Sequence, residues 1–85
     1  MKNEPLKLMQ RIRFRLSKKV LLDAGAFYRY YATTIHGKPA IVQVNPHSKN
    51  PDFRTITVED YLRRFRKPED IDLERRTLHG LGFDV

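Results

Sequence analysis

Apolar residues recur every three or four positions along the first third of the chain, which is the spacing of one buried helix face. These residues are Leu6, Met9, Ile12, Leu16 and Val20. Cations recur at a similar spacing on the opposite side, at Lys7, Arg11, Arg15 and Lys18. Asn3 and Pro5 suit a helix start, and Gly25 suits a helix stop. The pattern predicts a long amphipathic basic helix that ends near Asp23.

A strand is the competing interpretation of part of this segment. Residues 11–16 alternate strictly between basic and apolar, which is the period of a half-buried strand. Phe14, Leu21 and Leu22 also lie off the helical stripe. We favour the helix because the capping residues and the many good helix formers agree with it.

A β-hairpin is predicted over residues 26–45. The segment 27–35 is rich in aromatic and β-branched residues, and His36-Gly37 can form a two-residue turn before the return strand 39–44. That turn pairs Tyr31 with Val42. Alternation then gives a core face with Phe27, Tyr31, Val42 and Val44, and an outer face with Tyr28, Tyr30 and Gln43.

Two short helices are predicted after the loop 46–52. Thr57 can cap the first helix, with Asp60 at the acidic position of a capping box. Its apolar stripe is Val58, Tyr61, Leu62 and Phe65. The spacings Glu59–Arg63 and Asp60–Arg64 suit ion pairs along the helix, and Lys67-Pro68 ends it. The second helix begins at Pro68 and runs to about His79, with Gly80 as its stop.

These elements predict one compact α+β domain over residues 1–85: a long N-terminal amphipathic basic helix, a β-hairpin and two short C-terminal helices. All four elements are expected to contribute to one core. The expected core residues are Leu6, Met9, Ile12, Leu16, Val20, Phe27, Tyr31, Val42, Val44, Val58, Tyr61, Leu62, Phe65 and Leu78.

Charge is distributed unevenly along the chain. The 85 residues include 17 Lys and Arg against 10 Asp and Glu, a net charge of +7. Residues 1–22 carry +6, residues 23–53 carry +1, residues 54–67 carry +3 and residues 68–85 carry −3. A basic end of this kind is typical of proteins that bind polyanions, most often nucleic acid.

Composition excludes several other classes. The chain has no Cys, which excludes disulfides, thiolate zinc sites and iron–sulfur clusters and suits a reducing compartment. No apolar run approaches the roughly 18 residues of a membrane span. Charges interrupt the first twenty residues, where a secretory signal needs an apolar stretch. A cytoplasmic protein with no membrane partner is expected.

The basic helix face is the strongest candidate binding site, because cations one turn apart can follow a phosphate backbone. On the hairpin, Tyr28 and Tyr30 beside Arg29 could form a platform on which RNA bases stack. Both features also have a structural interpretation: a solvated helix face, and tyrosines buried beneath a helix. The candidate nucleic-acid-binding residues are Lys7, Arg11, Arg13, Arg15, Lys18, Lys19, Tyr28, Arg29 and Tyr30.

Catalysis has little support in the sequence. The three histidines lack the spacing of metal ligands, and no Gly-rich phosphate loop is present. Asp70, Asp72 and Glu74 are explained as acids near the start of a helix. The sequence therefore predicts neither an enzyme nor a cofactor or metal.

The predicted function is non-catalytic nucleic-acid binding with mainly electrostatic affinity and a modest preference for RNA, which rests on the two tyrosines. The alternative is a protein–protein adaptor or inhibitor that docks its basic helix or hairpin on an acidic partner protein. Competition by RNA or duplex DNA distinguishes the two. The oligomeric state stays open.

Several short motifs resemble, in the same order, those of protein ten of the small ribosomal subunit. They are residues 11–16 (RIRFRL), Pro46-His47, Phe53, Pro68 and residues 82–85 (GFDV). The match needs gaps and does not include residues 17–45. The resemblance implies a βαββαβ, ferredoxin-like fold as the alternative to the helix–hairpin–helix arrangement, and no residue roles are carried over from it.

Overall fold

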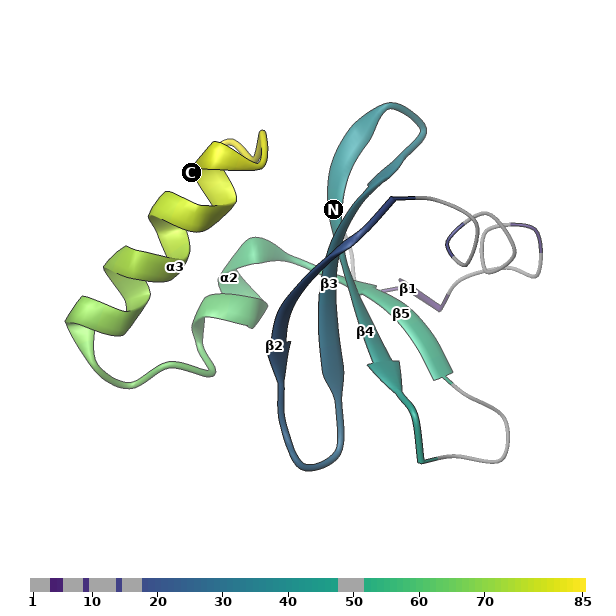
Figure 1. The fold of residues 1–85 in the computed structure, drawn as a ribbon, viewed down its shortest axis with the longest axis horizontal. Coiled ribbons are helices and arrows are strands. Elements are labelled where there is room, and N and C mark those ends of the chain that lie inside the picture. Colours follow the sequence, from purple (N-terminus) through teal and green to yellow (C-terminus); the bar gives the residue numbers. More distant parts are fainter. Residues whose placement is uncertain (1–3, 6–8, 10–13, 15–17, 48–51) are drawn as a thin grey trace.

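A computed structural model describes residues 4–5, 9, 14, 18–47 and 52–85. Its elements are β1 (Glu4–Pro5), β2 (Val20–Ala24), β3 (Arg29–Ile35), β4 (Lys38–Asn45), β5 (Asp52–Ile56), α2 (Val58–Leu62) and α3 (Pro68–Gly80). The strands form one antiparallel sheet in the order β1-β5-β4-β3-β2, of which β2 to β5 are a four-stranded meander. Both helices lie on the same side of this sheet, at the left in Figure 1.

The predicted long N-terminal helix is wrong. Its first residues, Glu4 and Pro5, pair with β5, and its last turn, Val20–Ala24, is strand β2. The backbone of β2 pairs with β3 along one side, and Leu22 packs against the core beneath the helices. At these two places strand pairing therefore overrides the helix propensity of the sequence, whereas Met9 and Phe14, between them, are helical. Of residues 10–16, the structure describes only Phe14.

The alternative βαββαβ order is not observed either. Within the described ranges, β2 to β5 follow one another without an intervening helix, α2 and α3 come after β5, and the helical residues Met9 and Phe14 come before β2. Every pair of neighbouring strands is antiparallel. A βαβ unit requires a parallel pair of strands, so the fold implied by the ribosomal resemblance does not apply to this part of the chain.

The β3–β4 hairpin confirms the predicted turn and register. His36 and Gly37 have positive φ angles of 52° and 76°, as a type I′ turn requires. Tyr31 pairs with Val42 across the two strands, as expected. Alternation along these strands then sends side chains to two opposite faces of the sheet, and both faces are buried.

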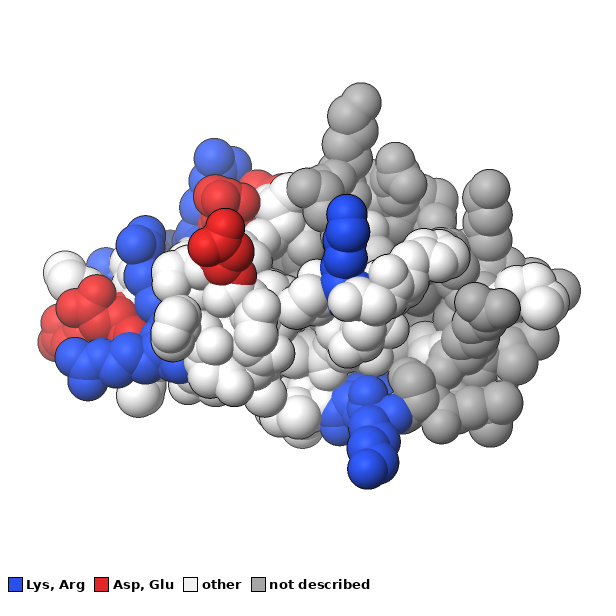
Figure 2. Space-filling model, turned by 90° about the horizontal axis from the view of Figure 1, so that it is seen from above, with Lys and Arg blue, Asp and Glu red and all other residues white. Residues whose placement is uncertain are grey.

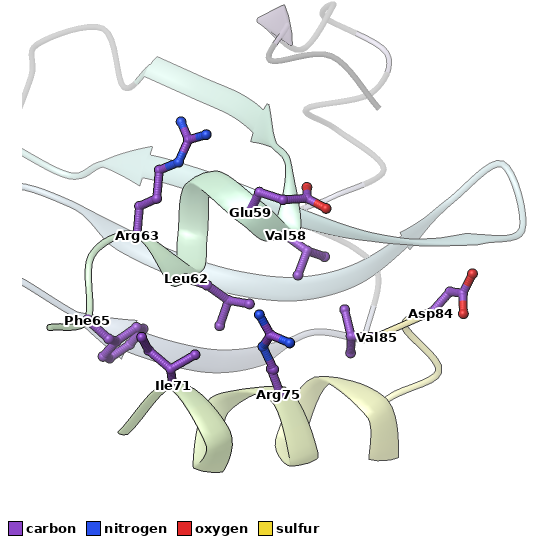
Figure 3. Close-up of a pocket in the computed structure, with 9 residues that line it drawn as sticks. All are labelled: Val58, Glu59, Leu62, Arg63, Phe65, Ile71, Arg75, Asp84 and Val85. Carbon is purple, nitrogen blue, oxygen red and sulfur yellow. The ribbon is translucent and has the colours of Figure 1, made fainter. Parts of the chain in front are cut away.

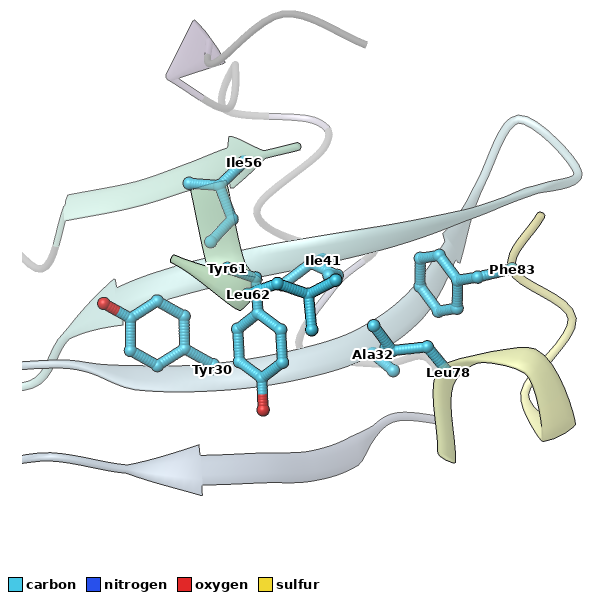
Figure 4. Close-up of a cluster of buried hydrophobic side chains, with 8 residues drawn as sticks. All are labelled: Tyr30, Ala32, Ile41, Ile56, Tyr61, Leu62, Leu78 and Phe83. Atoms are coloured by element: carbon cyan, nitrogen blue, oxygen red, sulfur yellow. The ribbon is translucent and has the colours of Figure 1, made fainter. Parts of the chain in front are cut away.

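One face packs against the two helices and the residues after α3. We call its buried residues the helix-side cluster, shown in Figure 4: Tyr30, Ala32, Ile41, Ile56, Tyr61, Leu62, Leu78 and Phe83. Tyr61 of α2 and Leu78 of α3 are fully buried. The two helices are therefore held on the sheet by side chains from both of them.

The opposite side of the sheet, called the far face, has a smaller core. Its buried residues, the far-face cluster, are Phe14, Val42, Val44 and Phe53, with Tyr31 and Ile35 packed against them. Three predicted core residues are exposed instead: Met9 at 65%, Val20 at 47% and Phe27 at 71%. Phe27 escapes the alternation because it precedes Arg29, where β3 begins, and lies in the turn after β2.

Capping of α2 follows the prediction. The Thr57 hydroxyl accepts a hydrogen bond of 3.1 Å from the backbone N–H of Asp60. The helix ends at Leu62 and not at Lys67 as predicted. Phe65 consequently lies after the helix, although it still packs against the helix-side cluster.

Helix α3 begins at Pro68 as predicted and ends in a Schellman motif. The backbone N–H of Phe83 donates to the Leu78 carbonyl at 3.0 Å, and that of Gly82 donates to the His79 carbonyl at 3.1 Å. Gly82, with a φ of 97°, supplies the left-handed residue that we expected at Gly80. The hydrophobic contact of this motif joins Phe83 and Leu78 in the helix-side cluster.

Candidate nucleic-acid interface

Phe14 brings the basic N-terminal segment onto the far face. Its ring is 6% exposed and makes edge-on contacts with Tyr31 and Phe53, at centroid distances of 5.6 and 5.7 Å. The Lys19 ammonium lies 5.1 Å from the centroid of the Phe14 ring and 3.4 Å from the Phe14 carbonyl oxygen. The Thr33 hydroxyl donates to the Lys18 carbonyl at 3.3 Å. Described residues of the basic segment therefore contact the sheet at its far face.

Strands β3 and β4 add two cations to the far face. Arg29 lies two residues before Tyr31 on β3, and Lys38 pairs with Ile35, whose side chain packs against the far-face cluster. Both cations are exposed. They lie at opposite ends of the strands, about 20 Å apart along β3 at 3.3 Å per residue. This span equals about six phosphates of one strand of a duplex.

The nine predicted site residues do not form a single patch. Lys7, Arg11, Arg13 and Arg15 lie outside the described residues. Lys18 and Lys19 come immediately before β2, whereas Tyr28, Arg29 and Tyr30 lie at or near the start of β3. Because β2 and β3 are antiparallel, these two groups are separated by the length of β2, about 15 Å.

Tyr30 is a core residue, as the structural interpretation of the tyrosines predicts. Tyr30 is only 5% exposed, and the guanidinium carbon of Arg64 lies 3.9 Å from the centroid of its ring. Arg64 also donates to a carboxylate oxygen of Asp23 at 2.6 Å. Tyr28 is 38% exposed, with its ring 6.5 Å from that of Tyr30. Arg64 thus covers the Tyr30 ring, and the expected platform of two exposed tyrosines is not formed.

Burial determines the ionisation of the two tyrosines in this cluster. Burial raises the pKa of the Tyr30 hydroxyl; the nearby Arg64 cation opposes this rise, while Tyr28 and Asp23 add to it. Burial also raises the pKa of Tyr61 far above its ordinary value. The second-largest cause of this rise is the hydrogen bond of 2.9 Å that the Tyr61 hydroxyl donates to Glu74. Both hydroxyls stay protonated near neutral pH, which suits a structural role rather than acid–base chemistry.

Charge differs between the strand and helix parts of the chain. Residues 1–56, which contain all the strands, have eleven Lys and Arg against three Asp and Glu; residues 57–85 have six against seven. In Figure 2, red side chains lie among blue ones over the helices at the left, while the blue side chains in the middle of the view have no red neighbours. Residues 1–56 are therefore the more basic part of the chain, and their described cations are Lys18, Lys19, Arg29, Lys38 and Arg54.

A groove of about 490 Å³ lies between α2, α3 and the C-terminal residues, shown in Figure 3. Its apolar lining is Val58, Leu62, Phe65, Ile71 and Val85. Two carboxylates, Glu59 and Asp84, and two guanidinium groups, Arg63 and Arg75, complete the lining. Because these four charges balance, the groove does not favour a polyanion.

Arg64 and Phe27 are the two residues whose roles sequence reasoning missed. The predicted pair of Arg64 with Asp60 is not formed: Asp60 contacts Arg63 at 3.1 Å, and Arg64 reaches Asp23 instead. Asp23 and Arg64 are 41 residues apart, so no local spacing indicates the pair. The signal for Phe27 was present, since a residue in a turn after Gly25 does not follow strand alternation.

Other chemistry finds no support in the described ranges. No three His, Asp or Glu side chains there lie together in a way that could hold a metal ion. No helix among the described residues is long and apolar enough to cross a membrane. Comparison of the chain with protein-family models, curated proteins and solved structures found no match.

Proposed function

We propose that this protein binds nucleic acid without catalysing a reaction, through the far face of the sheet and the adjoining start of β2. The separation of charge supports this proposal: the strand part of the chain carries eleven cations against three acids. Arg29 and Lys38 are exposed at the two ends of the far face, and Lys18 and Lys19 are exposed at its edge. Lys18 belongs to the cationic stripe predicted from the sequence, and the other members of that stripe lie outside the described residues.

Phosphate contacts account for most of the affinity in this proposal. Exposed cations that neutralise phosphates release counterions, so the binding constant falls as salt rises. The apolar residues of the far-face cluster are buried and offer few groups that could read base edges, so weak sequence preference follows. Burial of Tyr30 removes the original reason for an RNA preference, and the proposal therefore covers RNA and DNA.

The test compares two triple variants that each lower the net charge by three. One variant, the strand-layer variant, is Lys18→Gln, Arg29→Gln and Lys38→Gln, whose residues lie at or next to the ends of strands β2, β3 and β4. Its matched control is Arg66→Gln, Lys67→Gln and Arg76→Gln on the helical layer, where all three side chains are exposed. Binding to labelled single-stranded and duplex oligonucleotides is measured by fluorescence anisotropy over a series of salt concentrations.

The strand-layer variant should reduce the slope of log K against log salt by about two to three, at about 0.7–0.9 per lost phosphate contact. The control should change it little, because charges beyond about 8 Å are screened at physiological salt. Equal effects in both variants would contradict the proposed surface. A wild-type protein that binds neither oligonucleotide near physiological salt would contradict the function itself.

The rival function is binding to an acidic protein, and one feature of β2 favours it. This strand is at the edge of the sheet, and it exposes Val20 and Leu21 at 47% and 52%. An extended acidic peptide could pair with such an edge beside Lys18 and Lys19. Loss of binding to a strand-forming acidic peptide in Leu21→Lys, together with no oligonucleotide binding by wild type, would favour this rival.

A further inference from the structure

The turn between β2 and β3 presents an aromatic ring to solvent. Phe27 is 71% exposed, more than any other large apolar residue in the described part of the chain. The backbone N–H of Gly25 donates to the Tyr28 carbonyl at 2.8 Å and closes the turn. Phe27 belongs to neither buried cluster. Its ring is therefore open to contact by a ligand.

The turn stands on a fixed support. The Tyr28 ring lies 6.5 Å from the Tyr30 ring, and Tyr30 is held between the sheet and Arg64, whose guanidinium carbon is 3.9 Å from its centroid. Arg64 is in turn bonded to Asp23, the residue of β2 that lies two positions before Gly25. A ring presented on such a support can meet a flat ligand without ordering a long loop.

An exposed cation, Arg29, lies two residues after Phe27 in the chain. Arg29 follows Tyr28 directly, is exposed and lies on the cationic far face. An exposed apolar ring and an exposed cation two residues apart in the chain fit an unpaired nucleotide, whose base has a π-face and whose phosphate is an anion. A base within a duplex is already stacked on its neighbours, so only an unpaired base can offer its face.

We propose that Phe27 stacks on an unpaired nucleobase while Arg29 contacts an adjacent phosphate, so that the protein prefers single-stranded nucleic acid to duplex. This inference rests on the proposed function and adds a substrate class to it. Every nucleobase offers a π-face, so the preference for unpaired strands is expected to tolerate sequence. The unpaired base can belong to RNA or DNA, and separate probes distinguish these sources.

The test replaces Phe27 by Ala and uses Leu73→Ala as the matched control. Leu73 is an apolar residue of α3 that is 60% exposed, so both changes remove a solvent-facing apolar side chain. Probes are unstructured single-stranded RNA, single-stranded DNA and a duplex of equal length. Phe27→Ala should bind the single strands roughly 5- to 150-fold more weakly and the duplex less than about 2-fold more weakly. Leu73→Ala should bind all three probes like wild type.

A second variant reports stacking directly. The chain contains no Trp, so Phe27→Trp introduces a single indole at the tip of the turn. Its emission should be quenched by single-stranded RNA or DNA and not by duplex, with single-strand affinity at or above that of wild type.

Three outcomes would overturn the inference. In the first, Phe27→Ala binds single strands as wild type does while wild type binds both probe types; the proposed function then stands and the stacking role falls. In the second, the indole responds to vesicles of zwitterionic and anionic lipid and not to single strands, which assigns the tip to a membrane surface. In the third, wild type binds no nucleic acid, which removes the proposed function and this inference together.

Discussion

The helix-side cluster contains eight buried residues and the far-face cluster contains four. Two helices cover the first, whereas Phe14, from the basic N-terminal segment, lies at the centre of the second. The two parts of the chain also differ in charge, because residues 57–85 are close to neutral whereas residues 1–56 carry eleven Lys and Arg against three Asp and Glu. The larger core thus carries most of the burial, while the smaller core leaves exposed cations around it.

This difference teaches that one side of the sheet holds most of the core, while the other side has the exposed cations on which the proposed binding depends. The helix side buries two tyrosines. Arg64 covers the ring of Tyr30, and the Tyr61 hydroxyl donates a hydrogen bond to Glu74. The far face has exposed cations at Arg29 and Lys38. Variants of buried residues on either side should therefore lower the free energy of unfolding, whereas variants of the exposed far-face cations should change nucleic-acid affinity and leave that free energy almost unchanged.

The largest expected effect breaks the far-face cluster. Phe14→Ala removes the ring between Tyr31 and Phe53 and should lower the free energy of unfolding by about 3–5 kcal/mol. Met9→Ala, in the same segment, removes a residue that is 65% exposed and should change it by less than about 0.5 kcal/mol. Urea denaturation measures both values. A loss below about 1 kcal/mol for Phe14→Ala would mean that the far face is not closed by this ring.

A smaller loss of stability is expected when Arg64 is replaced, because its side chain contacts Asp23 of β2 and Tyr30 of β3. Arg64→Ala should cost about 1–2 kcal/mol, mainly through the lost contact with the Tyr30 ring, because its ion pair with Asp23 is partly solvated. Arg64→Lys should recover part of this loss, since it keeps the charge and loses the planar contact.

Arg63→Ala is the matched control for Arg64. The Arg63 side chain is 78% exposed in its ion pair with Asp60, so its removal should leave the free energy of unfolding almost unchanged. If Arg63→Ala and Arg64→Ala lower stability equally in a urea melt, the stacking of Arg64 on Tyr30 does not stabilise the fold.

The smallest effect on the free energy of unfolding near neutral pH is expected for Tyr61, and this effect should depend on pH. Tyr61→Phe removes the hydrogen bond to Glu74 and should cost about 1 kcal/mol at neutral pH. Because folding raises the pKa of Tyr61, its contribution is complete below pH 10, the pKa of unfolded tyrosine, and is lost as the pH rises above that value. The variant cannot ionise at this position, so the difference in stability should shrink above pH 10.

Urea melts at neutral pH and at alkaline pH measure this change. Val42→Ala on the far face serves as the control, because it removes no titratable group and should differ from wild type by a constant amount. A stability difference for Tyr61→Phe that stays the same across this range would contradict the burial of the Tyr61 hydroxyl as the source of its raised pKa.

Sequence by itself determined the features that depend on neighbouring residues. The turn at His36-Gly37, the pairing of Tyr31 with Val42, the Thr57 cap and the start of α3 at Pro68 were predicted and are observed. Turn geometry and capping act over a few residues, so local pattern is enough to specify them. The basic character of the N-terminal part is likewise a property of the sequence.

Only the tertiary structure decided the features that depend on distant partners. Val20–Ala24 became a strand because its backbone pairs with β3, although its sequence also fits a helix. Tyr30 became a core residue because Arg64, 34 positions later, covers its ring. Phe27 stayed in solvent because the turn ends before β3 begins. A local pattern assigns each side chain to a face, but only packing between distant segments decides which faces are covered.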